Sequence, residues 1–215
     1  MRAMESEIQS LTQHDTWTLH DLPSDKRSIG CKWVFRIKRK PNGEIVKFKA
    51  RLVAKGFTQR PGVDYFETFA PVARKESINV AIALAAEQDL MMENVDVDTA
   101  FLYGEIKEVI YMDQPDRFVD EQHRDKKCLL NKALYGTKQA AREWNHRLNA
   151  HLKSQGFTRT SADLCVYVRR SNAEFSLVII HVDDSMLFAR TQEHIDDIKR
   201  ALKTEFSIKE LGELK

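Results

Sequence analysis

Hydrophobic residues run in short blocks along this chain, and the clearest block surrounds two acidic residues. Residues 175–189 read FSLVIIHVDDSMLFA, with apolar and β-branched residues on both sides of Asp183 and Asp184. This pattern predicts two strands joined by a tight turn, a β-hairpin with both carboxylates at its tip. Aspartate is also common in turns for purely local reasons, so the pair alone leaves a structural role open.

A second stretch, residues 94–102, alternates polar and apolar positions up to Asp98 and then becomes apolar. The alternation predicts a strand that runs into a turn or short helix, with Asp96 and Asp98 on the same face. Neighbouring carboxylates repel, and a divalent cation relieves that repulsion. If Asp96 lies across from the hairpin tip, three carboxylates converge. Such a set suits two Mg²⁺ ions about 4 Å apart and the transfer of phosphoryl or nucleotidyl groups.

Helical patterns occupy four other segments. Three of them are residues 2–11, 77–90 and 139–155. The Ala- and Leu-rich second segment is expected to pack on the strand that carries Asp96. Thr191 is a candidate N-cap of the fourth helix, whose predicted core stripe is Ile195, Ile198 and Leu202. Because strands and helices do not alternate regularly, the expected fold class is α+β and not a doubly wound sheet.

Charge is unevenly distributed, although the net charge is only +2. Between Lys26 and Arg60 there are twelve Lys or Arg and one acid, Glu44, so this stretch carries +11 and the remainder −9. Residues 40–44, KPNGE, predict a tight turn between two alternating strands. Cations with interleaved aromatics suit phosphate contacts and stacking on unpaired bases, but a solvated cationic hairpin shows the same pattern.

Composition agrees with a globular domain of 215 residues that is 42% hydrophobic. No apolar run reaches about 18 residues, and the N-terminus lacks a basic start followed by an apolar core. We therefore expect neither a membrane span nor a signal peptide. The three cysteines are far apart and have no zinc-ligand spacing, which favours the reduced cysteines of an intracellular protein.

Seven blocks, collinear from about residue 17 to residue 215, resemble the reverse transcriptase of copia-type LTR retrotransposons. They are KWVFR (32–36), KARLVAKGFTQ (49–59), TFAPVAR (68–74), DVDTAFL (96–102), YMDQP (111–115), LYGTKQAAREW (134–144) and HVDD (181–184). Each block alone is weak, but seven in the family's order are specific. The resemblance implies an RNA-directed DNA polymerase, a nucleotidyltransferase that forms part of a retrotransposon Pol polyprotein.

The resemblance also implies a right-hand polymerase fold with fingers and palm subdomains only, in which an antiparallel palm sheet packs on helices. The implied fingers are residues 1–85 and 120–147, and the implied palm is residues 86–119 and 148–215. The thumb and the RNase H domain that normally follow are not expected within residues 1–215.

Site residues follow from the matching blocks. Asp96, Asp183 and Asp184 match the catalytic carboxylates that bind two Mg²⁺ ions, with Mn²⁺ as an alternative, and Val97 would add a backbone carbonyl. One ion would activate the primer 3′-OH and the other would hold the triphosphate. The residues implied for dNTP binding are Lys49, Arg51, Phe101, Tyr135 and Gly136. Those implied near primer and template are His181, Lys138 and Gln139.

Two of these assignments keep alternatives. Phe101 falls where such enzymes place a bulky side chain against the 2′ position of the sugar, yet a core aromatic after a strand has the same spacing. Lys49 and Arg51 both lie in the block implied for triphosphate contact, and the sequence does not choose between them.

Three positions depart from the family's usual pattern: His181 replaces Tyr, Thr137 replaces Leu and Ala141 replaces Pro. They keep open a second function, a catalytically inactive remnant or a co-opted nucleic-acid-binding module. A two-metal nuclease is a third, which would not need Phe101 or the basic strands. The partners implied are an RNA template, a DNA or RNA primer, dNTPs and the rest of the Pol polyprotein, including integrase and RNase H, with no membrane. The implied setting is intracellular, in cytoplasmic virus-like particles or the nucleus.

Overall fold

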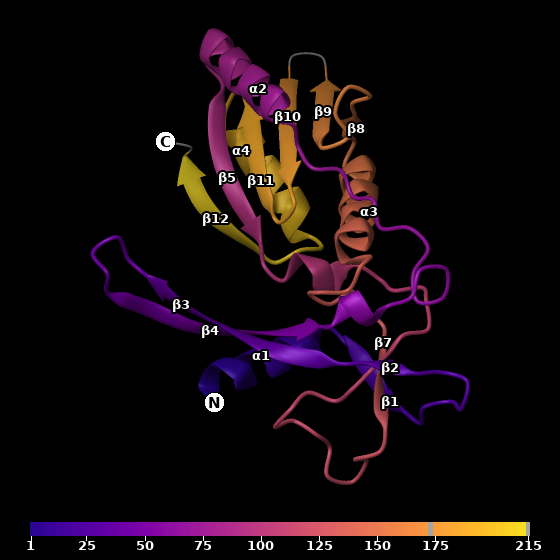
Figure 1. The fold of residues 1–215 in the computed structure, drawn as a ribbon. Coiled ribbons are helices and arrows are strands. Elements are labelled where there is room, and N and C mark those ends of the chain that lie inside the picture. Colours follow the sequence, from indigo (N-terminus) through magenta and orange to yellow (C-terminus); the bar gives the residue numbers. More distant parts are fainter. Residues whose placement is uncertain (172–173, 214–215) are drawn as a thin grey trace. The chain divides into compact units, whose positions relative to one another are not determined.

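A computed structural model of the chain describes residues 1–171 and 174–213. The chain forms two compact units (Figure 1). Unit 1 comprises Met1–Phe69 and Phe101–Trp144, and unit 2 comprises Ala70–Ala100 and Asn145–Lys215. Among the described residues there are four α-helices and three β-sheets, which confirms the predicted mixture of helices and sheets.

Unit 1 contains the helix α1, a small sheet and a long hairpin. Its elements are α1 (Arg2–Gln13), β1 (Trp17–His20), β2 (Ser28–Ile29), β3 (Cys31–Arg39), β4 (Ile45–Ala54), η1 (Gly56–Thr58), β6 (Tyr111–Met112) and β7 (Lys127–Leu130). The small sheet has the strand order β1-β7-β6-β2, and β3 and β4 form a separate two-stranded sheet. Leu11, Leu52, Met112 and Leu134 are fully buried members of one hydrophobic cluster that joins α1, the hairpin and the sheet.

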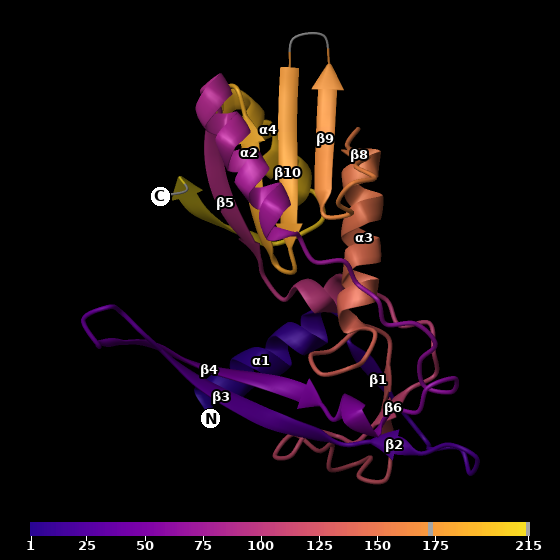
Figure 2. The ribbon, with the colours of Figure 1, turned by 45° about the horizontal axis from the view of Figure 1, so that its top comes forward.

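The β3–β4 hairpin is the predicted basic hairpin, and it extends past α1 (Figures 1 and 2). Its turn closes where the sequence predicted it: the Lys40 amide donates to the Glu44 carbonyl at 2.8 Å. The Asn42 side chain accepts a hydrogen bond from the Glu44 amide, and Gly43 adopts φ +85°. Asn and Gly therefore supply the local bond and the left-handed residue that this turn requires.

Cross-strand register divides the hairpin into two chemically different faces. Directly paired residues point to the same face, and the pairs Trp33–Leu52, Phe35–Ala50 and Ile37–Phe48 are apolar. The intervening pairs are cationic or mixed: Lys32–Val53, Val34–Arg51, Arg36–Lys49 and Lys38–Lys47. The cations and aromatics that interleave in sequence thus lie on opposite faces.

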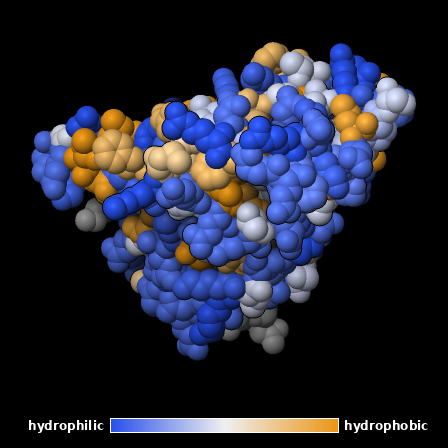
Figure 3. Space-filling view, turned by 90° about the horizontal axis from the view of Figure 1, so that it is seen from below, coloured by the Kyte–Doolittle hydropathy of each residue, from blue (hydrophilic) through white to orange (hydrophobic). Residues whose placement is uncertain are grey.

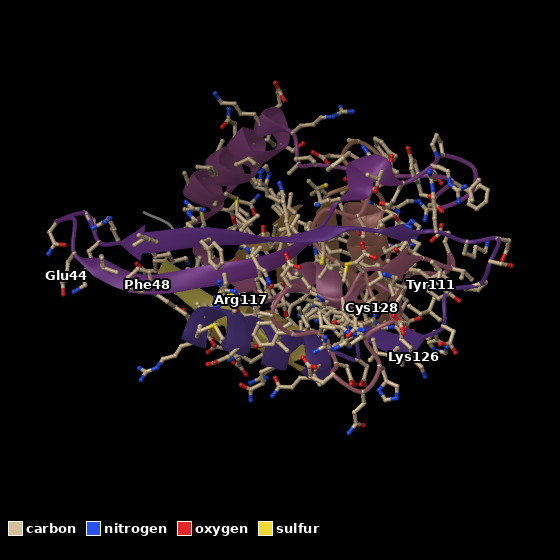
Figure 4. All side chains as sticks on the ribbon, turned by 60° about the horizontal axis from the view of Figure 1, so that its bottom comes forward. Glu44, Phe48, Tyr111, Arg117, Lys126 and Cys128 are labelled. Atoms are coloured by element: carbon tan, nitrogen blue, oxygen red, sulfur yellow. The ribbon has the colours of Figure 1, made fainter. Side chains whose placement is uncertain are left out.

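The outer part of the apolar face is uncovered within unit 1. Phe35 and Phe48 are 65% and 60% exposed. Figure 3 shows hydrophobic side chains gathered over this end of the hairpin, and Figure 4 shows Phe48 on β4 and Glu44 at the turn.

Unit 2 is built on one antiparallel sheet with the strand order β12-β5-β11-β10-β9-β8. The strands are β5 (Met91–Val97), β8 (Thr158–Arg159), β9 (Val166–Ser171), β10 (Glu174–His181), β11 (Asp184–Ala189) and β12 (Ile208–Glu213). Helices α2 (Lys75–Gln88) and α4 (Gln192–Lys203) lie on opposite faces of this sheet (Figures 1 and 2). Ala81 and Ala85 of α2 are buried with Leu177, Ile179 and Phe188, and Met92 of the Asp96 strand packs against them.

Helix boundaries follow the sequence signals closely. The Thr191 side chain caps α4 by accepting a hydrogen bond from the His194 amide, as predicted. The predicted core stripe of α4 is confirmed, because Ile195, Ile198 and Leu202 are all fully buried. Two elements cross the division between the units: η2 (Ala100–Tyr103) and α3 (Ala140–Ser154).

No helix in the described parts of the chain is long and apolar enough to cross a membrane.

Cys31, Cys128 and Cys165 are free thiols, as their spacing predicted. Burial raises the pKa of the Cys128 thiol to about 12.

Gly136 should be hard to replace, because it combines a left-handed backbone conformation with close packing. Its φ is +93°, and a Cβ would overlap the Ala54 carbonyl oxygen and lie 2.7 Å from Val53 Cγ1. We expect Gly136→Ala to destabilise unit 1 by about 2–4 kcal/mol, because both the backbone and the packing must change. Gly43→Ala is the matched control: its φ is +85° but nothing lies within 4 Å, so about 1 kcal/mol is expected.

The measurement is urea unfolding followed by tryptophan fluorescence. Trp17, Trp33 and Trp144 all belong to unit 1, so the signal reports on that unit. Equal losses in the two variants would show that the close approach of Gly136 to β4 does not matter for stability.

Candidate active site

The β10–β11 hairpin carries the acidic pair at its tip, as the sequence predicted. The strands pair from Ser176–Ala189 to His181–Asp184, which leaves only Val182 and Asp183 in the turn. Val182, the first of the two turn residues, has φ +62°, whereas Asp183 does not have a positive φ. Two-residue turns of this kind usually have glycine at the first position. A β-branched residue in this conformation costs of order 1–3 kcal/mol, and such strain is concentrated at functional sites.

Asp96 lies beside this tip. On strand β5 it is the direct partner of Asp184, so the two side chains project from the same face of the sheet. The Val97 amide donates to the Asp183 carbonyl at 2.9 Å, which ties the end of β5 to the turn. The condition posed by the sequence, that Asp96 lies across from the hairpin tip, is therefore met for Asp184.

The electrostatics of the tip show that these carboxylates affect one another. The pKa of Asp184 is raised, first by partial burial and then by the negative charges of Asp183 and Asp96. His181, the strand partner of Asp184, acts in the opposite direction. Excess negative charge at the end of two strands is the condition that a bound cation relieves.

The fit to a divalent metal rests on donor chemistry. Among the described residues, no group of three or more His, Cys, Asp or Glu side chains lies close enough together to hold a metal ion. Asp96, Asp183 and Asp184 nevertheless offer the carboxylate oxygens that Mg²⁺ prefers, and the mutual repulsion at Asp184 favours a cation. The donor set therefore fits Mg²⁺, while a coordinating arrangement is not formed.

Residues implied for dNTP binding meet in unit 1. The Arg51 guanidinium lies 4.9 Å from the Tyr135 ring centroid, and the Tyr135 ring lies 4.8 Å from that of Phe101. Lys49 and Arg51 are two residues apart on β4 and belong to its cationic face. Gly136 follows Tyr135 and packs against the end of β4, since the Ala54 amide donates to the Tyr135 carbonyl at 2.8 Å. The structure thus brings Arg51, Tyr135 and Phe101 together around the Gly136 turn.

Gln139 and Lys138 are held by a side chain that sequence analysis did not single out. Gln59 donates to the Gln139 side chain at 3.1 Å and accepts from the Lys138 amide at 2.8 Å. Gln139 is fully buried and also donates to the Asp64 carbonyl and to Glu108. Its amide is therefore engaged within unit 1, whereas the Lys138 side chain is exposed.

One charged residue near the carboxylates was also missed. Lys209 on β12 is the strand partner of Asp96, and its ammonium contacts Asp98. The residues around Lys209 in the sequence do not indicate that it lies beside Asp96, because this proximity depends on the pairing of β12 with β5.

Comparison with known proteins shows the family of the chain. A model of the family described as reverse transcriptase (RNA-dependent DNA polymerase) matches residues 14–215. The chain belongs to this family. Its sequence-based assignment to the reverse transcriptase domain of a copia-type retrotransposon Pol polyprotein is confirmed.

Relatives from plants and yeast match nearly the whole chain. A Retrovirus-related Pol polyprotein from transposon TNT 1-94 of Nicotiana tabacum is 42% identical over 99% of this chain and 16% of its own length. One from transposon RE2 of Arabidopsis thaliana is 37% identical over 99% of this chain and 15% of its own. The Transposon Ty1-H Gag-Pol polyprotein of Saccharomyces cerevisiae is 28% identical over 99% of this chain and 12% of its own. The chain thus spans less than a fifth of the length of these relatives.

Proposed function

We propose that this chain is the core of an RNA-directed DNA polymerase that adds dNTPs to a primer 3′-OH on an RNA template. Family membership supports polymerase chemistry in general. The observation that carries the finer proposal is the direct pairing of Asp96 with Asp184 beside the Asp183 turn, because it places carboxylates from two chain segments on one face of the sheet.

Asp96, Asp183 and Asp184, with the Val97 carbonyl, would hold two Mg²⁺ ions or Mn²⁺ in their place. When bound, these ions would lower the pKa of the primer hydroxyl and neutralise charge on the triphosphate and the pyrophosphate leaving group. His181, at the end of β10 beside Asp184, would contact the primer end.

The residues of unit 1 would bind and orient the nucleotide. Arg51 presents a guanidinium that can grip phosphate oxygens through two parallel hydrogen bonds, and Lys49 adds charge on the same strand face. Phe101, packed against Tyr135, would oppose a 2′-hydroxyl and so favour dNTPs. Gly136 would let the backbone approach the substrate, and Lys138 would contact the template phosphates.

In the language of right-hand polymerases, we assign unit 1 to the fingers and unit 2 to the palm. Relative to the bounds expected from sequence, this assignment moves residues 70–85 and 145–147 to the palm and residues 101–119 to the fingers. The proposed partners are template, primer, dNTPs and the other parts of a Pol polyprotein, such as integrase and RNase H.

Primer extension on an RNA template tests this proposal. The purified chain is incubated with an annealed primer, Mg²⁺ and dNTPs, beside Asp183→Asn and a sample with chelator. We expect extension by the wild type only, because the variant loses one metal-binding carboxylate while keeping a side chain of the same shape.

Template binding, measured by fluorescence anisotropy, is the control for folding and nucleic-acid contact. Binding without extension would contradict the polymerase proposal for this chain and favour a nucleic-acid-binding module. Shortening of the strand instead of extension would favour a nuclease.

A further inference from the structure

Lys209 continues the row of charged residues across the sheet of unit 2. Strand β12 pairs with β5 so that Lys209 is opposite Asp96, and β11 pairs with the other edge of β5 so that Asp184 is opposite Asp96. Directly paired residues share a face. One cation and two carboxylates therefore lie side by side on three adjacent strands.

Lys209 contacts two carboxylates, Asp96 on β5 and Asp98 just after the end of this strand. Its Nζ contacts Asp98 Oδ1 and lies 3.9 Å from Asp96 Oδ2. The Lys209 side chain is 58% exposed, and an ion pair this exposed contributes about 1 kcal/mol or less to stability. Stabilising the fold is thus a minor effect of this pair, and its main effect is on the charge at Asp96.

The backbone of β12 is held from the opposite face. Glu210 points toward α4, where Lys199 contacts it at 3.0 Å and Lys203 also hydrogen-bonds to it. The Asp98 amide donates to the Ser207 carbonyl at 2.9 Å, which fixes the start of the strand. Lys209 can therefore leave Asp98 and Asp96 by rotating its own side chain, without moving the strand.

We propose that Lys209 is an internal counterion of Asp96 and Asp98 that competes with divalent cations for Asp96. This inference rests on the proposed function, since it assumes that Asp96 is a metal ligand. Because the Lys209 ammonium lies 3.9 Å from Asp96 Oδ2, a cation held by Asp96 would be repelled by it, and binding would be weakened until the lysine side chain turns away. Lys209 thereby places a positive charge beside Asp96 without contacting substrate. This charge sets the metal affinity of the free protein.

Mn²⁺ binding to the full chain tests the inference without an activity assay. Free Mn²⁺ gives a sharp electron paramagnetic resonance spectrum that is lost on binding, so a titration yields the affinity. We expect Lys209→Gln to tighten binding by roughly fivefold to tenfold at low ionic strength, with a smaller effect in high salt. Lys209→Arg keeps the charge and should retain the wild-type affinity.

Two further variants make the outcomes distinguishable. Lys203→Gln removes an exposed cation of α4, which pairs with Glu210 on the other side of β12, and should leave Mn²⁺ affinity unchanged. Asp96→Asn should weaken binding in the wild-type background and cancel the gain from Lys209→Gln. If Asp96→Asn weakens binding but Lys209→Gln does not tighten it, the counterion role is wrong and the metal site stands. If Asp96→Asn has no effect, the ion binds elsewhere, and both the metal site and this inference are wrong.

Discussion

Asp96→Asn should reduce primer extension at least about a thousandfold and, in metal-free buffer, should raise the melting temperature. The loss follows if the Asp96 carboxylate holds a catalytic ion, because the amide that replaces it is a weaker ligand without charge. A loss of about 4 kcal/mol of transition-state stabilisation corresponds to a thousandfold loss in rate.

The gain in stability follows from the repulsion at the hairpin tip. Asp96 is one of the charges that raise the pKa of Asp184, after burial and Asp183. Removing it relieves that repulsion, but solvent screens charges this exposed, so we expect a gain of less than about 1 kcal/mol, a rise of at most about 2–4 °C for a chain of this size. A variant that is more stable and yet inactive separates a catalytic role from a structural one.

The pH dependence of this gain has a defined sign. Because the folded-state pKa of Asp184 is raised, the folded protein binds that proton more tightly than the unfolded chain does. Stability is therefore lost as the pH rises through the folded-state pKa of Asp184. The difference in melting temperature between Asp96→Asn and the wild type should be largest at neutral pH and should shrink as the pH falls below that pKa.

Asp98→Asn is the matched control, since it makes the same change two residues further along the same segment. Its charge is already balanced by contact with Lys209, so we expect a change in extension of less than about threefold. Extension rates and melting curves with and without Mg²⁺ check both variants. Equal losses in the two would show that general negative charge, and not ligation by Asp96, supports the reaction.

Local sequence patterns predicted much of unit 2. The run around Asp183 and Asp184 predicted the hairpin because apolar strands flanking a polar pair have few other stable arrangements. Thr191 marked the start of α4 through its own hydrogen bond to the backbone. Residues 94–102 predicted a strand that runs into a turn or short helix, and β5 with η2 follows that pattern, although β5 ends at Val97, one residue before Asp98.

The pairing of strands that are distant in the sequence could not be predicted from local patterns. The position of Lys209 depends on the register between β12 and β5, which are more than a hundred residues apart in sequence. The packing of Arg51 on Tyr135 likewise depends on the close approach of the Gly136 turn to β4. Register between distant strands is set by the packing of the whole unit, so a local pattern predicts the strands but not their partners.

The basic hairpin shows how a correct element can change a functional interpretation. Its turn and strands were predicted, and the interleaved cations and aromatics were interpreted as suited to phosphate contact and base stacking. The register places Arg36 and Lys49 on one face and Phe35 and Phe48 on the other. Phosphate contact and base stacking would therefore use different faces of this hairpin.

Lys199→Ala should destabilise unit 2 by about 3–5 kcal/mol, the largest stability effect we expect from a single charged residue. Lys199 on α4 is 8% exposed and contacts Glu93 at 3.0 Å, Asp196 at 2.9 Å and Glu210 at 3.0 Å. Burial works against its ammonium, but the hydrogen bonds to three carboxylates outweigh burial and raise the pKa of Lys199.

The cost arises mainly at Glu93. The Glu93 side chain is 10% exposed, and without Lys199 its remaining hydrogen bond in this network is from Gln192 at 2.7 Å. Asp196 and Glu210 are exposed and can be solvated instead. Replacing both buried partners, Lys199→Met with Glu93→Leu, should recover much of the loss because no buried charge is left unpaired.

Lys203→Ala is the matched control for this prediction. Lys203 also pairs with Glu210 but is 50% exposed, so its loss should cost less than about 1 kcal/mol. Hydrogen exchange of the β5 and β12 amides is the measurement, because the tryptophans lie in unit 1 and do not report on this sheet. Similar exchange in the Lys199 and Lys203 variants would show that the buried ammonium is not what holds α4, β5 and β12 together.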